Sequence, residues 1–197
     1  MSQLIALPRR FSPTSHANDN AGIVGFAALT ALGAQIQVPI PGTPVPMTLQ
    51  TLPVILAPCF LGARRGVLSM ALYIAVGLLG APVFADASSG LHVVLGATGG
   101  YLLGFFLAQP VIARVLRSTP GAPSWRDRLA AVIIGQIVIF TVGVLWLSVV
   151  MHSGLGDALA KGLVPFLPGD VLKSALAVLI TLPVGRGSRA GDDPSAA

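Results

Sequence analysis

Charge is scarce in this 197-residue sequence. Asp, Glu, Lys and Arg make up 10% of the residues, whereas soluble domains carry roughly 25%. Hydrophobic residues account for 54%, and the mean hydropathy is +0.83. This composition argues against an ordinary soluble domain and indicates that lipid, rather than water, surrounds most of the chain.

Reactive side chains are equally few. Cys59 is the only cysteine, so no internal disulfide can form. The three histidines belong to no HExxH motif, and no GxSxG motif occurs. An intramembrane enzyme is therefore a disfavoured alternative, and we expect no catalytic residue, no cofactor and no bound metal.

Long apolar segments recur along the chain, several of them near the about 17–25 residues that cross a hydrocarbon core. We expect an all-α membrane protein with six transmembrane helices in one bundle. The expected helices are 21–38, 51–63, 66–80, 97–117, 129–151 and 169–185. The second and third are short, and Pro53 and Pro58 should distort the second, as membrane helices tolerate. Residues 1–20 and 186–197 are expected to be cytoplasmic tails, and 21–185 to form the one domain.

Positive charge is distributed unevenly over this predicted topology. With the N-terminus in the cytoplasm, all ten arginines lie on the cytoplasmic side, and only Lys161 and Lys173 lie on the outer side. An excess of Lys and Arg in cytoplasmic loops is the usual determinant of membrane orientation. We therefore expect both termini in the cytoplasm. The same asymmetry explains the net charge of +5 without a nucleic-acid partner.

Polar residues gather in the predicted outer connections, 39–50, 81–96 and 152–168. The first, "PIPGTPVPMTLQ", has four prolines in eight residues and should be stiff, because proline fixes φ near −65°. Two interpretations are open, a shaped plug over the bundle or a tight connection between helices. The second ends in the glycine-rich turn "GATGGY", which lacks the lysine and the preceding strand of a phosphate-binding P-loop. Glycine there is expected to allow close backbone approach to a helix or a ligand.

The third connection leads into "VPFLPGDVLKSALAVLI", where Asp170 and Lys173 stand three residues apart and so share one side of a helix. Asp170 alone could be a helix cap. A cation one turn inside a helix opposes the helix dipole, and a charge at the bilayer centre costs at least ~2.5 kcal/mol. A ligand-binding pair is the favoured interpretation. An internal ion pair, or a Lys173 that extends outward to the interface, is the alternative.

Four segments, taken in order, resemble the BioY family. They are "VPMTLQTLPVILAPCFLGARRGVLSMALYIAVGLLGAPVF", "LGATGGYLLGF", "GVLWL" and "VPFLPGDVLKSALA", and the resemblance runs from Ala21 to Val184. A mild departure is Ala97, where many relatives have proline; no donor or acceptor is lost. BioY proteins are the biotin-specific substrate-binding (S) subunits of energy-coupling factor (ECF) transporters. The absence of a Walker motif agrees with ATP hydrolysis by separate subunits.

The resemblance implies a six-helix membrane fold with an outward-facing pocket that captures biotin, in the cytoplasmic membrane of a bacterium or archaeon. Implied partners are biotin, a transmembrane coupling subunit, two cytoplasmic ATPase subunits and the lipid bilayer. It assigns Asp170 and Lys173 to the substrate site. The rest of the pocket is expected from Gln50, Phe84, Asp86, Thr98, Gly99 and Tyr101. Which group meets which end of biotin is open, and an S subunit for another vitamin is the alternative.

A stripe of small residues, Ala27, Ala31 and Ala34, follows one side of the first predicted helix. Small residues four apart allow close helix contact in membranes. By the resemblance, this stripe docks on the coupling subunit. Packing inside the protein's own bundle is the alternative, because a small stripe does not specify which helix it meets.

Overall fold

The computed structural model of the protein describes residues 13–119 and 121–182. Five helices make up most of the bundle: α1 (Pro13–Gln35), α2 (Thr51–Leu78), α4 (Gly99–Arg117), α5 (Trp125–Val150) and α7 (Leu167–Thr181). Shorter elements connect them: β1 (Gln37–Val38), β2 (Met47–Thr48), η1 (Ala85–Ala87), α3 (Leu91–Leu95), α6 (Leu155–Gly162) and η2 (Val164–Phe166).

The expected all-α membrane architecture is confirmed. α1 begins inside the segment expected to be a tail, and the expected tail 186–197 lies outside the described residues.

α2 contains the two short helices expected at 51–63 and 66–80. Gly62 separates its two limbs, with φ 76° and ψ −178° in a region that favours glycine. By length and composition, four of the described helical stretches could cross a membrane, namely 51–78, 99–117, 125–150 and 155–181. The apolar part of α1, Asn20–Gln35, is shorter. With α2 divided at Gly62, the expected six apolar segments are all present.

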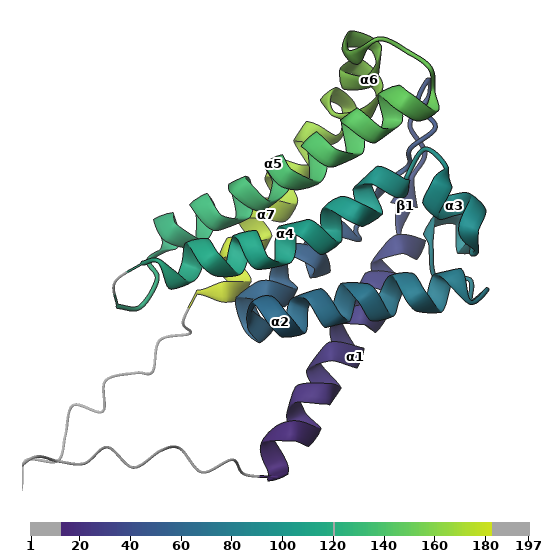
Figure 1. The fold of residues 1–197 in the computed structure, drawn as a ribbon. Helices are drawn as coiled ribbons and strands as arrows, with labels where there is room; N and C mark the ends of the chain where they lie inside the picture. The colour runs from purple at the N-terminus through teal and green to yellow at the C-terminus, as the bar shows by residue number, and fades with distance from the viewer. Residues whose placement is uncertain (1–12, 120, 183–197) are drawn as a thin grey trace, which may run out of the picture.

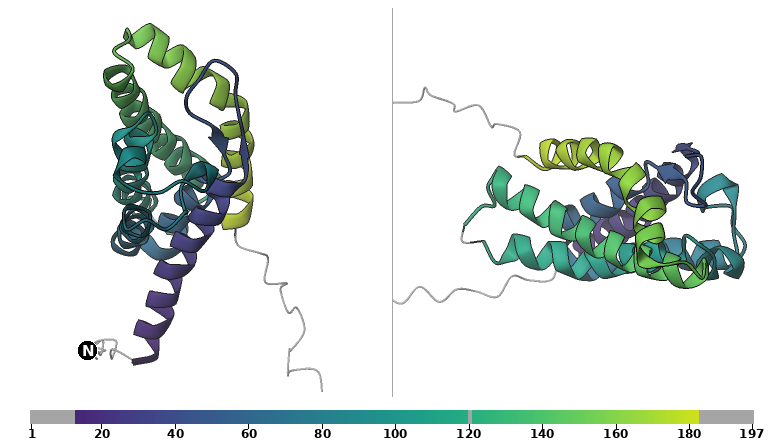
Figure 2. Two further views of the ribbon diagram at one scale, coloured as in Figure 1. Left: turned by 90° about the vertical axis from the view of Figure 1, so that its right-hand side faces the viewer. Right: turned by 90° about the horizontal axis from the view of Figure 1, so that it is seen from above.

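The connections are sorted between the two ends of the bundle. β1, α3 and α6 lie together at one end, while the connection between α4 and α5 lies at the opposite end (Figure 1). A further view shows the same separation (Figure 2). β1 and β2 pair antiparallel, Gln37 with Thr48 and Val38 with Met47, and so close the proline-rich connection into a hairpin. We refer to the end that carries this hairpin as the hairpin end.

The core lies where α2, α4 and α5 meet. Ile55, Ile112, Ile139 and Leu147 are fully buried there. A Cβ at Gly104 would lie 2.9 Å from the Cα atom of Ile139, so glycine at this position lets the backbones of α4 and α5 approach closely. Exposed large apolar side chains cover the outer faces instead, from Val149 on α5 to Leu172 on α7. Such a surface fits hydrocarbon, where apolar side chains need no cover.

A buried glutamine compensates for the proline inside α2. Pro58 has no N–H, so the carbonyl of Val54, four residues earlier, loses its helical donor. Gln109 of α4 is fully buried, and its Nε2 donates to this Val54 oxygen at 3.1 Å and to Phe105 O at 2.9 Å. Membrane helices tolerate proline where a neighbour satisfies the freed carbonyl. Gln109 is that neighbour, and its bond ties α4 to the first limb of α2.

Replacement of Gln109 by leucine should lower the free energy of unfolding by about 1–3 kcal/mol, because the Val54 carbonyl would be left buried without a donor. Gln136 of α5 provides the matched control. It is also buried, but neither side-chain polar atom has a partner among the described residues. Gln136→Leu should leave the free energy of unfolding unchanged or raise it, because no hydrogen bond to a described residue is lost. Thermal unfolding of both variants in the same detergent checks this, and equal shifts for the two would contradict the role of Gln109.

Candidate functional site

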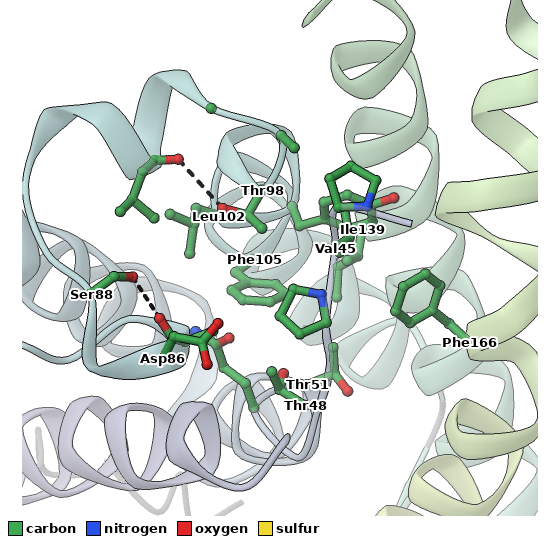
Figure 3. A pocket seen from close by; sticks show the side chains of 18 of the residues that line it. Val45, Thr48, Thr51, Asp86, Ser88, Thr98, Leu102, Phe105, Ile139 and Phe166 are labelled. Carbon is green, nitrogen blue, oxygen red and sulfur yellow. Dashed lines mark hydrogen bonds between the residues drawn. The ribbon is translucent and has the colours of Figure 1, made fainter. Parts of the chain in front are cut away.

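A cavity of about 330 Å³ lies at the hairpin end of the bundle. Its walls come from the proline-rich hairpin, the segment from Ala85 to Thr98, and helices α2, α4, α5 and α7. Figure 3 shows Thr48 and Thr51 together on one side of it, with Phe105 to the left and Phe166 to the right. The volume lies within the range of small-molecule pockets, about 300–1,000 Å³. The cavity is therefore large enough for a small metabolite.

A buried ion pair forms the most polar part of the wall. Lys173 Nζ lies 2.6 Å from Asp170 Oδ1, and the two residues are only 7% and 6% exposed. Lys173 Nζ also donates to the backbone oxygen of Thr48 at 3.1 Å, and Thr51 Oγ1 donates to Asp170 Oδ1 at 3.3 Å. Partners of this kind are what a buried charge requires. The pair joins the start of α7 to the hairpin and to α2.

Of the alternatives for these two residues, the structure contains the internal ion pair, but neither the helix cap nor a lysine that extends outward. α7 begins at Leu167 after Phe166, so Asp170 is past the cap position and makes no capping bond. Lys173 is buried and points to Thr48, so it does not extend outward to the interface.

The pair keeps hydrogen-bonding capacity for a ligand. An ammonium has three donors, and the described residues take up two of those of Lys173, through Asp170 and Thr48. Among the described residues, nothing donates to Asp170 Oδ2. The site thus presents a free acceptor and a free donor side by side. A ligand with an N–H next to a carbonyl matches this arrangement.

Gln50 and Tyr73 extend the polar wall. Gln50 Nε2 donates to the Tyr73 hydroxyl, which donates to the backbone oxygen of Val83 at 3.2 Å. Both side chains are buried and both line the cavity, as predicted for Gln50. The glutamine carbonyl oxygen accepts no hydrogen bond from the described residues and is a second acceptor on this wall.

Aromatic rings form a further part of the wall. Tyr101, Phe105, Phe140 and Phe166 line the cavity. The Tyr101 and Phe140 rings meet edge to face with centroids 6.3 Å apart, and the Tyr101 hydroxyl donates to Gly162 O at 2.7 Å. Sequence reasoning found Tyr101 and missed the three phenylalanines. The spacing of Tyr101 and Phe105, one helical turn apart, was the available signal.

Two of the predicted site residues do not line the cavity. Phe84 is 1% exposed and lies behind the wall, with its ring edge to face with that of Tyr73 at 5.5 Å between centroids. A side chain at Gly77 would overlap the Phe84 ring, so this glycine creates the notch that holds it. Gly99 instead allows α4 to begin against the backbone oxygen of Val94.

The remaining predicted residues, Asp86 and Thr98, do line the cavity. Asp86 is exposed at the rim and accepts a hydrogen bond from Gln37 Nε2. The Thr98 hydroxyl donates to Val93 O at 3.4 Å, which is a long bond. Of the eight predicted residues, the structure thus brings six together around one cavity.

The predicted docking stripe on α1 is largely inside the molecule. Ala27 and Ala34 are buried, and Ala31 is partly buried against the core. α1 packs mainly on α2. These two buried alanines already contact the protein's own bundle. That α1 docks on a coupling subunit stays a prediction, and any such contact needs the exposed side of the helix.

A second, apolar groove of about 720 Å³ lies between α5, α6 and α7. Asp170 and Phe140 line both this groove and the cavity. Exposed leucines, among them Leu145, Leu155 and Leu167, form its outer edge. Only a thin layer of side chains therefore separates the ion pair from the outer surface of the bundle.

Three comparisons with known proteins agree on one family. The BioY family model matches residues 7–190. The "Probable biotin transporter BioY" of Pyrococcus horikoshii is 40% identical over 155 residues, which are 79% of this chain and 88% of that protein. The "Biotin transporter BioY" of Thermotoga maritima is 40% identical over 162 residues, 82% and 91% of the two chains. A crystal structure of the S-component for biotin from an ECF-type ABC transporter superposes with a TM-score of 0.79 at 25% identity, covering 87% of this chain and 92% of that one.

Proposed function

Because the chain belongs to the BioY family, we propose that it is the substrate-binding subunit of an ECF transporter and captures biotin for uptake. The observation that carries this proposal is the buried Asp170–Lys173 pair, with its free acceptor and free donor, in a cavity that aromatic rings also line. Relatives at 40% identity are named biotin transporters, and the similar solved structure is a biotin S-component. The chain is a transport protein rather than an enzyme.

The chemistry of biotin matches the two walls. Its ureido ring has two N–H donors and a carbonyl, its thiophane ring and side chain are apolar, and its tail is a carboxylate. Asp170 Oδ2 would accept a ureido N–H, and Lys173 would donate to the ureido carbonyl. The phenylalanines, including Phe105 and Phe166, would contact the apolar part. A tail carboxylate beside Asp170 would be repelled by its charge, so the tail is assigned to the cavity mouth, away from the pair.

The substitution Asp170→Asn should weaken biotin binding by about 1.5–3 kcal/mol, the range for hydrogen bonds to charged groups. Asp157→Asn is the matched control. Asp157 also pairs with a lysine, Lys161 at 3.0 Å, but that pair is exposed on α6 and does not line the cavity. Binding of labelled biotin to the purified variants, with thiamine and riboflavin as competitors, provides the measurement. Unchanged affinity in a folded Asp170→Asn protein would show that Asp170 does not bind biotin. Displacement of biotin by thiamine or riboflavin would show that the site is not specific for biotin.

We also propose that the hairpin end faces outward and that both termini are cytoplasmic, in the cytoplasmic membrane of a bacterium or archaeon. The support is the placement of Arg114, Arg117, Arg126 and Arg128 around the opposite end, where the positive-inside rule expects them. A single cysteine introduced at exposed Gly42 of the hairpin should react with a membrane-impermeant maleimide in intact cells, and the parent protein, whose Cys59 is only partly exposed, should not. Labelling of Gly42→Cys only after cell lysis would contradict this orientation.

The two cytoplasmic ATPases and the transmembrane coupling subunit are the proposed partners, and α1 is the proposed docking helix. On the exposed side of α1, Ala28 is small, and the space next to Gly25 is open. Such a surface allows close approach of a partner helix. The candidate docking surface is therefore the exposed side of α1, and not the side of buried Ala27 and Ala34.

Ala28→Trp should leave biotin affinity near that of the parent protein and reduce co-purification with the coupling and ATPase subunits, because bulk at a close helix crossing prevents docking. Ala27→Trp is the contrasting variant. Ala27 is buried, so this change should lower the thermal unfolding midpoint by overpacking the core. An Ala28→Trp protein that still assembles fully would rule out this side of α1.

A further inference from the structure

One wall of the cavity is a short segment that belongs to no long helix. Ala85, Asp86 and Ser88 line the cavity from this segment. Asp86 and Ala87 both have left-handed backbone conformations, with φ of 58° and 49°. Residues other than glycine adopt this conformation at a cost and need surroundings that hold them there. The shape of this wall therefore depends on what fixes the segment from outside.

Gln35, the last residue of α1, contacts the segment on both sides of the strained turn. Its Nε2 donates to the backbone oxygen of Phe84 at 3.0 Å, and its Oε1 accepts from the backbone N–H of Ala87 at 3.2 Å. One side-chain amide thus satisfies a backbone acceptor and a backbone donor that are three residues apart. Nε2 also donates to Ala31 O at 3.2 Å, which holds the side chain against its own helix.

The segment is held by packing on its other side. The Phe84 ring fills the notch at Gly77 and meets Tyr73, whose hydroxyl donates to Val83 O at 3.2 Å. This anchor fixes where the segment begins. It does not reach Asp86 and Ala87, where the backbone is strained. Toward these two residues, the side-chain hydrogen bonds from α1 and β1 are those of Gln35 and Gln37.

We propose that Gln35 is a positioning residue for the ligand site: it holds Asp86 and Ala87 in the conformation that closes the cavity wall, without contact with the ligand itself. The proposal rests on the proposed function of the cavity. The competing account is that the segment's own hydrogen bonds are sufficient. These run from Phe84 N to Ser88 O at 3.0 Å, and to Ala85 O from Ser88 N at 3.2 Å and from Ser88 Oγ at 2.6 Å.

The test is Gln35→Met in the full-length protein in lipid nanodiscs, since methionine keeps the length of the side chain and removes both hydrogen bonds to the segment, together with the bond to Ala31 O. Biotin dissociation should become about three- to tenfold faster, as expected for the loss of two partly exposed hydrogen bonds. Hydrogen exchange at the Ala87 amide should also accelerate, with or without biotin. The thermal unfolding midpoint should change little, because the Phe84 anchor and the helical core remain.

Two further variants separate positioning from a general effect on α1. Gln35→Glu keeps an acceptor for the Ala87 N–H but has no donor for Phe84 O, so its dissociation rate and exchange should be intermediate. Ile36→Met changes the next residue, which is 61% exposed, and should match the parent protein in both measurements.

Unchanged exchange at Ala87 in Gln35→Met would overturn the proposal and favour the segment's own hydrogen bonds. Faster exchange with unchanged biotin dissociation would also overturn it, because the ligand would then not depend on this wall. A parent protein that binds no biotin would refute the proposed function instead. The exchange measurement would still decide whether Gln35 holds the segment.

Discussion

Two opposite charges taken out of water are the constraint that the hairpin end of this protein has to satisfy. Neither charge is tolerable in a low-dielectric environment without the other and without further hydrogen bonds. Asp170 and Lys173 meet this requirement with Thr51 and with the backbone of Thr48, so the ion pair binds the proline-rich hairpin and α2 to the start of α7. The hydrogen bonds that stabilise the buried pair therefore also hold the hairpin over the cavity.

Small residues and aromatic residues divide the bundle into a closed part and an open part. Glycine at 104 lets α4 and α5 meet backbone to backbone in the middle of the bundle. Toward the hairpin end, the rings of Tyr101, Phe140 and Phe166 stand between the helices instead. A tightly packed centre with a ring-lined space at one end gives a rigid cavity, because the rings have few rotatable bonds and pack against each other.

Charges and prolines were predictable from the sequence, because their cost in a membrane limits where they can be. Asp170 and Lys173 followed from that cost, and the break predicted between residues 63 and 66 lies next to Gly62, where the structure divides α2. The orientation of apolar helices was not predictable, since lipid and core are both apolar and no periodicity distinguishes them. For this reason the burial of Ala27 and Ala34, the notch behind Phe84 and the phenylalanine wall appeared only in the structure. The role of Gln109 was not predictable either, because its partner on α2 is a backbone carbonyl.

The ion pair has an electrical consequence as well. Its two charges cancel over 2.6 Å, so the pair itself has no net charge on which a membrane potential can act. An anionic ligand does feel that potential, and an inside-negative voltage opposes its inward movement by about 2.3 kcal/mol per 100 mV. A neutral pair cannot lend the ligand a compensating positive charge for the crossing. Inward transport of such an anion therefore requires a source of work outside this chain, whatever the affinity of the cavity.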